Sequence, residues 1–84
     1  MSARSEGMAE AAVIAERVAR DLTIQAQILD VEAAQARRSG EFELARSLSL
    51  RATWRADGAA GAHQAAHAVG IAAIDAYWAD EAVR

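Results

Sequence analysis

The chain has 84 residues and a formal net charge of −3, and these figures already exclude large architectures. A chain below the usual domain size forms one domain, so two-domain enzymes, barrels and doubly wound sheets are excluded. Alanine supplies 24 residues, whereas proline, cysteine, lysine and asparagine are absent. The lack of cysteine excludes disulfides, thiolate metal sites and cysteine nucleophiles. The negative charge argues against a general nucleic-acid coat protein.

The composition and the first residues indicate a cytoplasmic protein. Residues 1–7 lack the apolar core of a signal peptide. Small secreted scaffolds usually need disulfides or a metal, and this chain has no cysteine to supply them. The longest uncharged run is Gly58–Ile74, 17 residues rich in alanine and glycine. That run is too short and too weakly apolar for a membrane span, so we expect no membrane partner.

The first half of the chain predicts one long helix, from about residue 5 to residue 38. Alanine is the best helix former, and the apolar residues recur at helical spacing. One stripe with alternating spacings of three and four consists of Met8, Ala11, Ala15, Val18, Leu22, Gln25, Leu29 and Ala36. Ile14, Ile28 and Val31 widen this apolar face. A face this wide is more than one neighbouring helix covers.

A turn is predicted at residues 39–41. Gly40 can adopt the left-handed conformation that ends a helix. Arg37 and Arg38 place positive charge at the carbonyl end of the first helix, and Glu41 and Glu43 place negative charge at the start of the next helix.

The rest of the chain predicts a second helix, from about residue 42 to residue 82. Its stripe of mostly small residues consists of Phe42, Ala45, Ser49, Ala52, Ala56, Ala59, His63, Ala66, Gly70, Ala73 and Tyr77. Gly58, Gly61 and Gly70 each cost about 1 kcal/mol in a helix relative to alanine. Either the helix is continuous and the glycines contact a neighbouring backbone, or it breaks at Asp57–Gly58 to give three helices. We favour the continuous helix.

The expected fold is therefore all-α, an antiparallel helical hairpin formed by a single domain over residues 1–84. A short turn makes consecutive helices antiparallel, so residues whose numbers add up to 79 or 80 should face each other. This register predicts Leu22 over Gly58, Val18 over Gly61, and Glu16 near His63.

The number of large apolar side chains predicts self-association. Two helices share one interface, and most of the valine, isoleucine, leucine and aromatic side chains cannot all lie in it. We expect a C2 dimer that forms a four-helix bundle. A compact three-helix monomer and a heteromeric protein partner that completes the core are the alternatives.

One segment resembles a known helical motif. Residues 32–52 place small residues before a turn of glycine, an acidic residue and an aromatic one, followed by alanine and leucine at helical spacing. This phrase is similar to the hairpin phrase of tetratricopeptide-like helical pairs. It covers about a quarter of the chain, and no second copy follows at a fixed period, so a repeat array is not predicted. The resemblance implies a tight helical turn and no function.

The two histidines form the only pattern typical of a metal site. His63 and His67 are four residues apart, so both rings project from one face of a helix. The hairpin register adds Glu16 as a third candidate ligand. We favour a hydrogen-bonded pair of interface histidines, with a metal site as the first alternative and a pH-sensitive switch as the second. No cofactor is expected.

Charge is unevenly distributed along the predicted hairpin. Residues 1–36 carry a net charge of −3, residues 37–55 carry +3, and residues 56–84 carry −3. The turn end is therefore basic and the open end acidic. The candidate partner-binding residues at the turn end are Arg37, Arg38, Arg46, Arg51, Trp54 and Arg55. They could hold phosphates and stack a base, or bind an acidic protein surface. We favour a solvated end, with Trp54 as an interface anchor.

These features together predict a small, non-catalytic interaction or assembly protein that acts through apolar helix faces. A two-helix rod offers no deep cleft for catalysis, and Gly58–Gly61 lacks the lysine and hydroxyl residue of a phosphate-binding loop. The expected partners are a second copy and another protein, with no small-molecule substrate. The alternatives are a nucleic-acid-associated regulator that uses the basic turn end, and a helical-bundle metalloprotein that uses the histidine pair.

Overall fold

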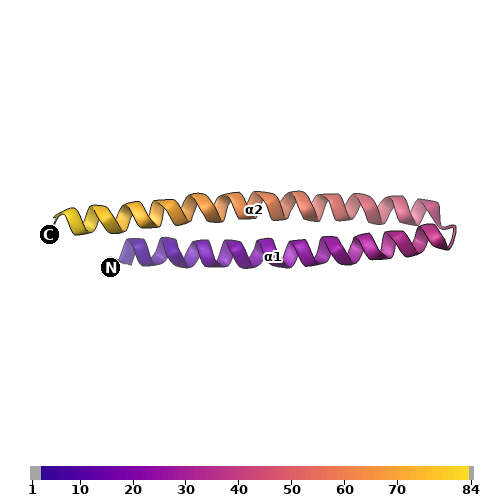
Figure 1. The fold of residues 1–84 in the computed structure, drawn as a ribbon, viewed down its shortest axis with the longest axis horizontal. Coiled ribbons are helices and arrows are strands. Elements are labelled where there is room, and N and C mark those ends of the chain that lie inside the picture. Colours follow the sequence, from indigo (N-terminus) through magenta and orange to yellow (C-terminus); the bar gives the residue numbers. More distant parts are fainter. Residues whose placement is uncertain (1–2, 84) are drawn as a thin grey trace.

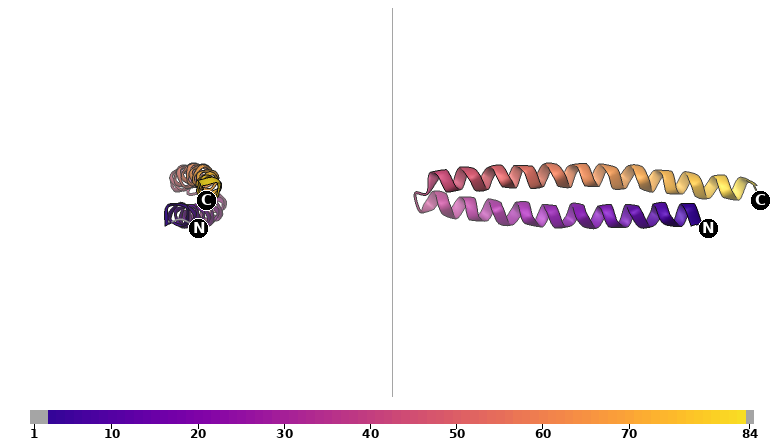
Figure 2. Two further views of the ribbon diagram at one scale, coloured as in Figure 1. Left: turned by 90° about the vertical axis from the view of Figure 1, so that its left-hand side faces the viewer. Right: turned by 180° about the vertical axis from the view of Figure 1, so that it is seen from behind.

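The protein is all-α in the computed structural model, which describes residues 3–83. Helix α1 spans Ala3–Arg38 and helix α2 spans Phe42–Val83, and no strand occurs among the described residues. The two helices run antiparallel, side by side along their whole shared length, and α2 extends past the start of α1 (Figure 1). The molecule is a rod of 67 × 12 × 11 Å that is only two helices thick in the end-on view of Figure 2.

Helix α2 is continuous, and the break considered at Asp57–Gly58 does not occur. The prediction placed the helices at about 5–38 and 42–82, and the structure gives 3–38 and 42–83. No proline interrupts either helix, and alanine is abundant enough to outweigh the cost of three glycines in α2. None of the described helices has the length and apolar content needed to cross a membrane.

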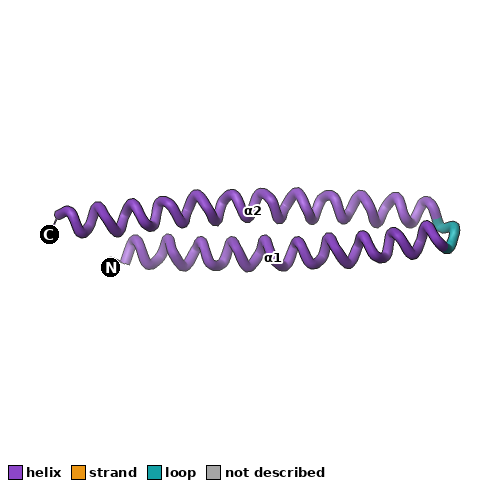
Figure 3. Tube along the Cα trace, viewed as in Figure 1, coloured by secondary structure: helices purple, strands orange, loops and turns teal. Residues whose placement is uncertain are grey.

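The turn has the hydrogen bonds of a glycine-terminated helix. Gly40 has a φ of 79°, the left-handed conformation that the sequence predicted. The Glu41 N–H donates to the carbonyl of Ala36 at 2.8 Å, and the Gly40 N–H donates to the carbonyl of Arg37 at 3.1 Å. These two bonds satisfy carbonyls that the end of α1 would otherwise leave free, so the reversal needs no longer loop (Figure 3).

Alanine at every seventh position forms the contact between the helices. The buried residues of α1 are Ser5, Ala19, Ala26, Ala33 and Ala36, and those of α2 are Ala45, Leu48, Ala52, Ala59, Ala66 and Ala73. The alanines at 19, 26 and 33 and those at 45, 52, 59, 66 and 73 each follow a strict seven-residue repeat, the period of a left-handed coiled coil. Leu48 is the one large apolar side chain in this core among the described residues.

The predicted contact stripes are partly wrong. On α1, Ala11, Val18 and Gln25 are exposed, and the adjacent residues Ala12, Ala19 and Ala26 point inward instead. On α2, the exposed members of the predicted stripe are Phe42, Ala56 and His63. The smallest side chains occupy the centre because they let two helix axes approach closely, and the larger apolar groups are displaced to the flanks.

The predicted register holds at two of its three pairs. A Cβ placed on Gly58 would lie 3.3 Å from Cδ1 of Leu22, so these two residues do face each other. Glu16 also meets His63, as described below. Val18 does not lie over Gly61, because a Cβ on Gly61 would have no neighbour within 4 Å and Val18 is 46% exposed. Gly61 and Gly70 both border open space, so the expected backbone contact at these glycines is absent.

Candidate interaction surface

Most of the large apolar side chains lie on the outside of the hairpin. Thirteen of them in the described chain are between 46% and 67% exposed: Val13, Ile14, Val18, Ile24, Ile28, Val31, Phe42, Leu44, Leu50, Trp54, Ile71, Ile74 and Trp78. The accessible area is 6037 Å². A compact monomer of this mass would expose about 4,800 Å². The hairpin therefore leaves about 1,200 Å² more surface in water than a folded monomer of its size usually does.

The strict seven-residue repeat gives the hairpin two distinct sides. Residues four positions after the core alanines of either helix lie on one side, which we call the polar side. There Nδ1 of His63 lies 2.9 Å from Oε1 of Glu16, and Nη1 of Arg37 donates to Oγ of Ser49 at 3.2 Å. Both contacts join α1 to α2, so they show that these two rows of residues face each other.

The opposite side, which we call the smooth side, carries small and apolar residues. It consists of Ile14, Val18 and Ile28 on α1 and of Leu44, Trp54, Gly58, Gly61, Ala65, Ala68 and Ala72 on α2, all exposed. Sequence reasoning placed some of these residues in the hairpin contact and did not identify them as a free face. The signal for it was present: a second row of small residues with spacings of three and four runs from Gly58 to Ala72, offset by one position from the core alanines.

An apolar groove lies at the open end of the polar side. Its walls come from both helices, and its larger side chains are Ile74, Tyr77 and Trp78. The rings of Tyr77 and Trp78 meet edge to face with centroids 5.4 Å apart. Ala9 and Gly70 form part of the floor, and the groove contains no charged residue.

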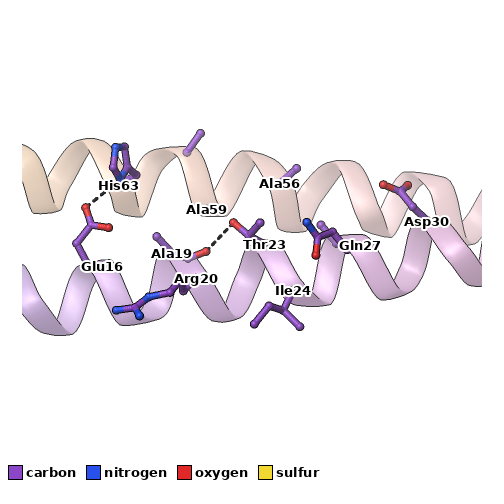
Figure 4. Close-up of a pocket in the computed structure, with 12 residues that line it drawn as sticks. Glu16, Ala19, Arg20, Thr23, Ile24, Gln27, Asp30, Ala56, Ala59 and His63 are labelled. Carbon is purple, nitrogen blue, oxygen red and sulfur yellow. Dashed lines mark hydrogen bonds and ion pairs between the residues drawn. The ribbon is translucent and has the colours of Figure 1, made fainter.

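The predicted metal ligands are only partly brought together. Glu16 and His63 meet across the helices at 2.9 Å (Figure 4), in a position where their side chains are 43% and 69% exposed. Among the described residues, no group of three histidine, cysteine, aspartate or glutamate side chains is placed to hold a metal ion, so His67 does not join the pair. Two donors are fewer than the three that protein zinc sites supply, and the contact is a surface ion pair.

The predicted arginine cluster is divided between the two sides of the rod. Arg37, Arg38, Arg46, Arg51, Trp54 and Arg55 are all exposed. In the seven-residue repeat Arg37 and Arg46 belong to the polar side, whereas Arg51, Trp54 and Arg55 are grouped at the smooth side. The turn end is therefore basic all round and does not present a single basic patch.

Comparisons of the chain with protein-family models, with curated proteins and with solved structures gave no match. The functional argument therefore depends on the surfaces of the hairpin itself.

Proposed function

We propose that this protein is a small, non-catalytic assembly protein that associates with other helices through its exposed apolar side chains. Its simplest assembly is a C2 dimer in which two hairpins form a four-helix bundle. The observation that carries the proposal is the inversion of the usual apolar arrangement. Alanine fills the core, while thirteen larger apolar side chains stay about half exposed or more.

The energetics favour covering these side chains. Full burial of one valine, leucine, isoleucine or phenylalanine contributes about 1.5–3 kcal/mol, and alanine contributes much less. The buried residues of the hairpin include ten apolar ones, of which nine are alanine. A second hairpin would bury several larger side chains at once, and large exposed apolar surfaces are typical of protein interaction sites.

Sedimentation equilibrium over a wide range of protein concentrations tests this proposal. The expected result is a mass twice that of the 8.9 kDa chain at micromolar concentration, with dissociation on dilution. A stable monomer at all concentrations would contradict it, provided that the same sample melts cooperatively and fails to bind an apolar dye. Such a monomer would have no unsatisfied apolar surface to explain.

Nucleic-acid binding at the turn end is the second candidate, and one observation favours it. None of the five arginines between residues 37 and 55 forms an ion pair with a carboxylate, and Arg37 alone has a side-chain hydrogen bond, to Ser49. Unpaired arginines beside the exposed Trp54 could contact phosphates and stack on a base.

The matched variants for this candidate change charge equally at two places. The double substitution Arg51→Glu with Arg55→Glu should abolish binding of a fluorescent single-stranded oligonucleotide, whereas Arg17→Glu with Arg20→Glu should not. Wild-type affinity should fall steeply as salt increases, because arginines displace the counterions of phosphates. Binding that is absent, or independent of salt, removes this candidate and leaves the assembly proposal intact.

A further inference from the structure

We propose that the smooth side is the dimer interface, and that two copies pair antiparallel with helix α2 against helix α2 and a two-fold axis near Gly58. The inference depends on the proposed assembly function and specifies its geometry. The occupant of the smooth side is thus a second copy of this chain, placed with its turn over the open end of the first.

The small residues of the smooth side allow a second helix to approach closely. Gly58, Gly61, Ala65, Ala68 and Ala72 are exposed and have the same alternating spacings of three and four as an ordinary helix contact. The hairpin itself shows that alanine rows in this chain support close helix packing. No charged residue occurs from Gly58 to Ile74, so a helix laid along this row desolvates no ion pair.

An axis near Gly58 matches large side chains to free space. In an antiparallel pairing about this position, Trp54 of one copy faces Gly61 of the other copy. Trp54 is 64% exposed, and a Cβ on Gly61 would meet nothing within 4 Å. On α1 the same axis places Val18 of one copy by Ile28 of the other, and both are about half exposed.

Charge favours the antiparallel arrangement over the parallel one. The turn end, residues 37–55, carries +3, and residues 1–36 and 56–84 carry −3 each. Antiparallel pairing places the basic turn end of each copy beside acidic residues of the open end, such as Glu6, Glu10 and Asp75. Parallel pairing would place two basic ends together, and like charges in an interface are unfavourable.

The available area is sufficient, and the polar side is less suitable. The excess surface of about 1,200 Å² exceeds the ~800 Å² that each partner contributes to a standard interface. The groove in the middle of the polar side is lined by Glu16, Arg20, Asp30 and His63. Covering that groove would remove water from four titratable side chains, whereas the smooth side contributes five large apolar ones: Ile14, Val18, Ile28, Leu44 and Trp54.

A pair of adjacent substitutions tests the choice of side. Gly61→Arg places a long charged side chain on the smooth side, in a position where the hairpin itself has free space. Ala60→Arg places the same side chain on the other side of α2, where Ala60 lines the polar groove. We expect Gly61→Arg to weaken dimerisation by more than tenfold in sedimentation equilibrium, and Ala60→Arg to leave it within about threefold of wild type. Circular dichroism checks that both variants remain helical.

The opposite outcome would overturn the inference. If Gly61→Arg dimerises like wild type, or if Ala60→Arg weakens the dimer as much, the smooth side is not the interface. The assembly function would still stand in either case, because wild type would still be a dimer.

Spin labels test the direction of pairing independently of these variants. The chain has no cysteine, so Gln64→Cys and Ile71→Cys each introduce a unique attachment site on the outer face of α2. With an axis at Gly58 and a rise of 1.5 Å per residue, the axial separation between copies is about 18 Å at position 64 and about 39 Å at position 71. Parallel pairing predicts equal separations at both positions.

The three results of this measurement are distinct. Separations that increase from position 64 to position 71 by about 20 Å support the antiparallel dimer. Equal separations contradict it and leave the assembly function in place. An absence of any coupling between labels, with a monomer mass, contradicts the proposed function itself.

Discussion

Gly40 and Gly70 both have open space around the position of a Cβ, yet their backbones differ. Gly40 has a φ of 79°, whereas Gly70 lies within helix α2. The left-handed conformation is strained for any residue with a Cβ, and a glycine inside a helix only forfeits helix propensity. Space alone therefore does not decide whether a glycine can be replaced.

Alanine substitution at these two glycines should have opposite effects. We expect Gly40→Ala to lower the free energy of unfolding by about 1–2 kcal/mol, because the turn forces alanine into the left-handed region. We expect Gly70→Ala to raise it by up to about 1 kcal/mol through helix propensity. Urea denaturation at one fixed protein concentration measures both. Equal effects of the same sign would contradict the described turn.

The ion pair between Glu16 and His63 should contribute little to stability. Both side chains are substantially exposed, and exposed pairs contribute about 0.2–1 kcal/mol at most. A double-mutant cycle with Glu16→Ala and His63→Ala should therefore give a coupling energy below about 1 kcal/mol. A coupling of several kcal/mol would mean that the pair is covered by a partner under the conditions of the measurement.

The sequence predicted part of the candidate surface at this scale. The hairpin register brought Glu16 to His63, because counting along two antiparallel helices fixes which residues face each other. It did not exclude His67, since four-residue spacing places two side chains on one face without fixing a third donor across the helices. The division of the arginines also depends on which side of the repeat each one occupies, and linear charge counts do not contain that information.

At the scale of the helix, the seven-residue alanine repeat determines the structure. The helix ends were predictable, because glycine and the charges beside it mark the turn and no proline interrupts the helices. The contact stripe of α1 was displaced by one residue at Ala12, Ala19 and Ala26, since we expected larger apolar residues such as Val18 to lie inside. Apolarity alone does not separate these rows, and close approach of the helices selects the smaller side chains.

Two adjacent alanines test this explanation. Ala59 is 7% exposed in the contact, and Ala60 is exposed. We expect Ala59→Leu to destabilise the hairpin by about 1–3 kcal/mol, because the larger side chain forces the helices apart. Ala60→Leu should change stability by less than about 0.5 kcal/mol, as surface substitutions usually do. Thermal melts at one concentration compare the two, and equal effects would show that alanine size does not control the contact.

At the scale of the whole molecule, the hairpin has a large surface and a core of very small side chains. A rod of 67 × 12 × 11 Å has no interior beyond the line of contact between its two helices. Half-exposed apolar side chains therefore occur along both helices and at both ends. The proposed association and the fold have the same cause, because alanine brings the helices together and leaves the larger residues no place inside.

The melting temperature should therefore depend on protein concentration. If folding and association are coupled, dilution shifts the equilibrium toward separate, less stable chains and lowers the melting temperature. Melting curves recorded by circular dichroism across a hundredfold range of concentration measure this shift. A constant melting temperature across the range would indicate that the hairpin is stable without a second copy.

The seven-residue repeat also makes the rod a ruler. Seven residues inserted into each helix at matching positions would lengthen it by about 10.5 Å and keep every residue on its original side. A single inserted residue would instead rotate all that follows by about 100° and carry the smooth row away from its place. Length in such a protein can therefore change only in whole steps, and its binding faces tolerate growth but not slippage.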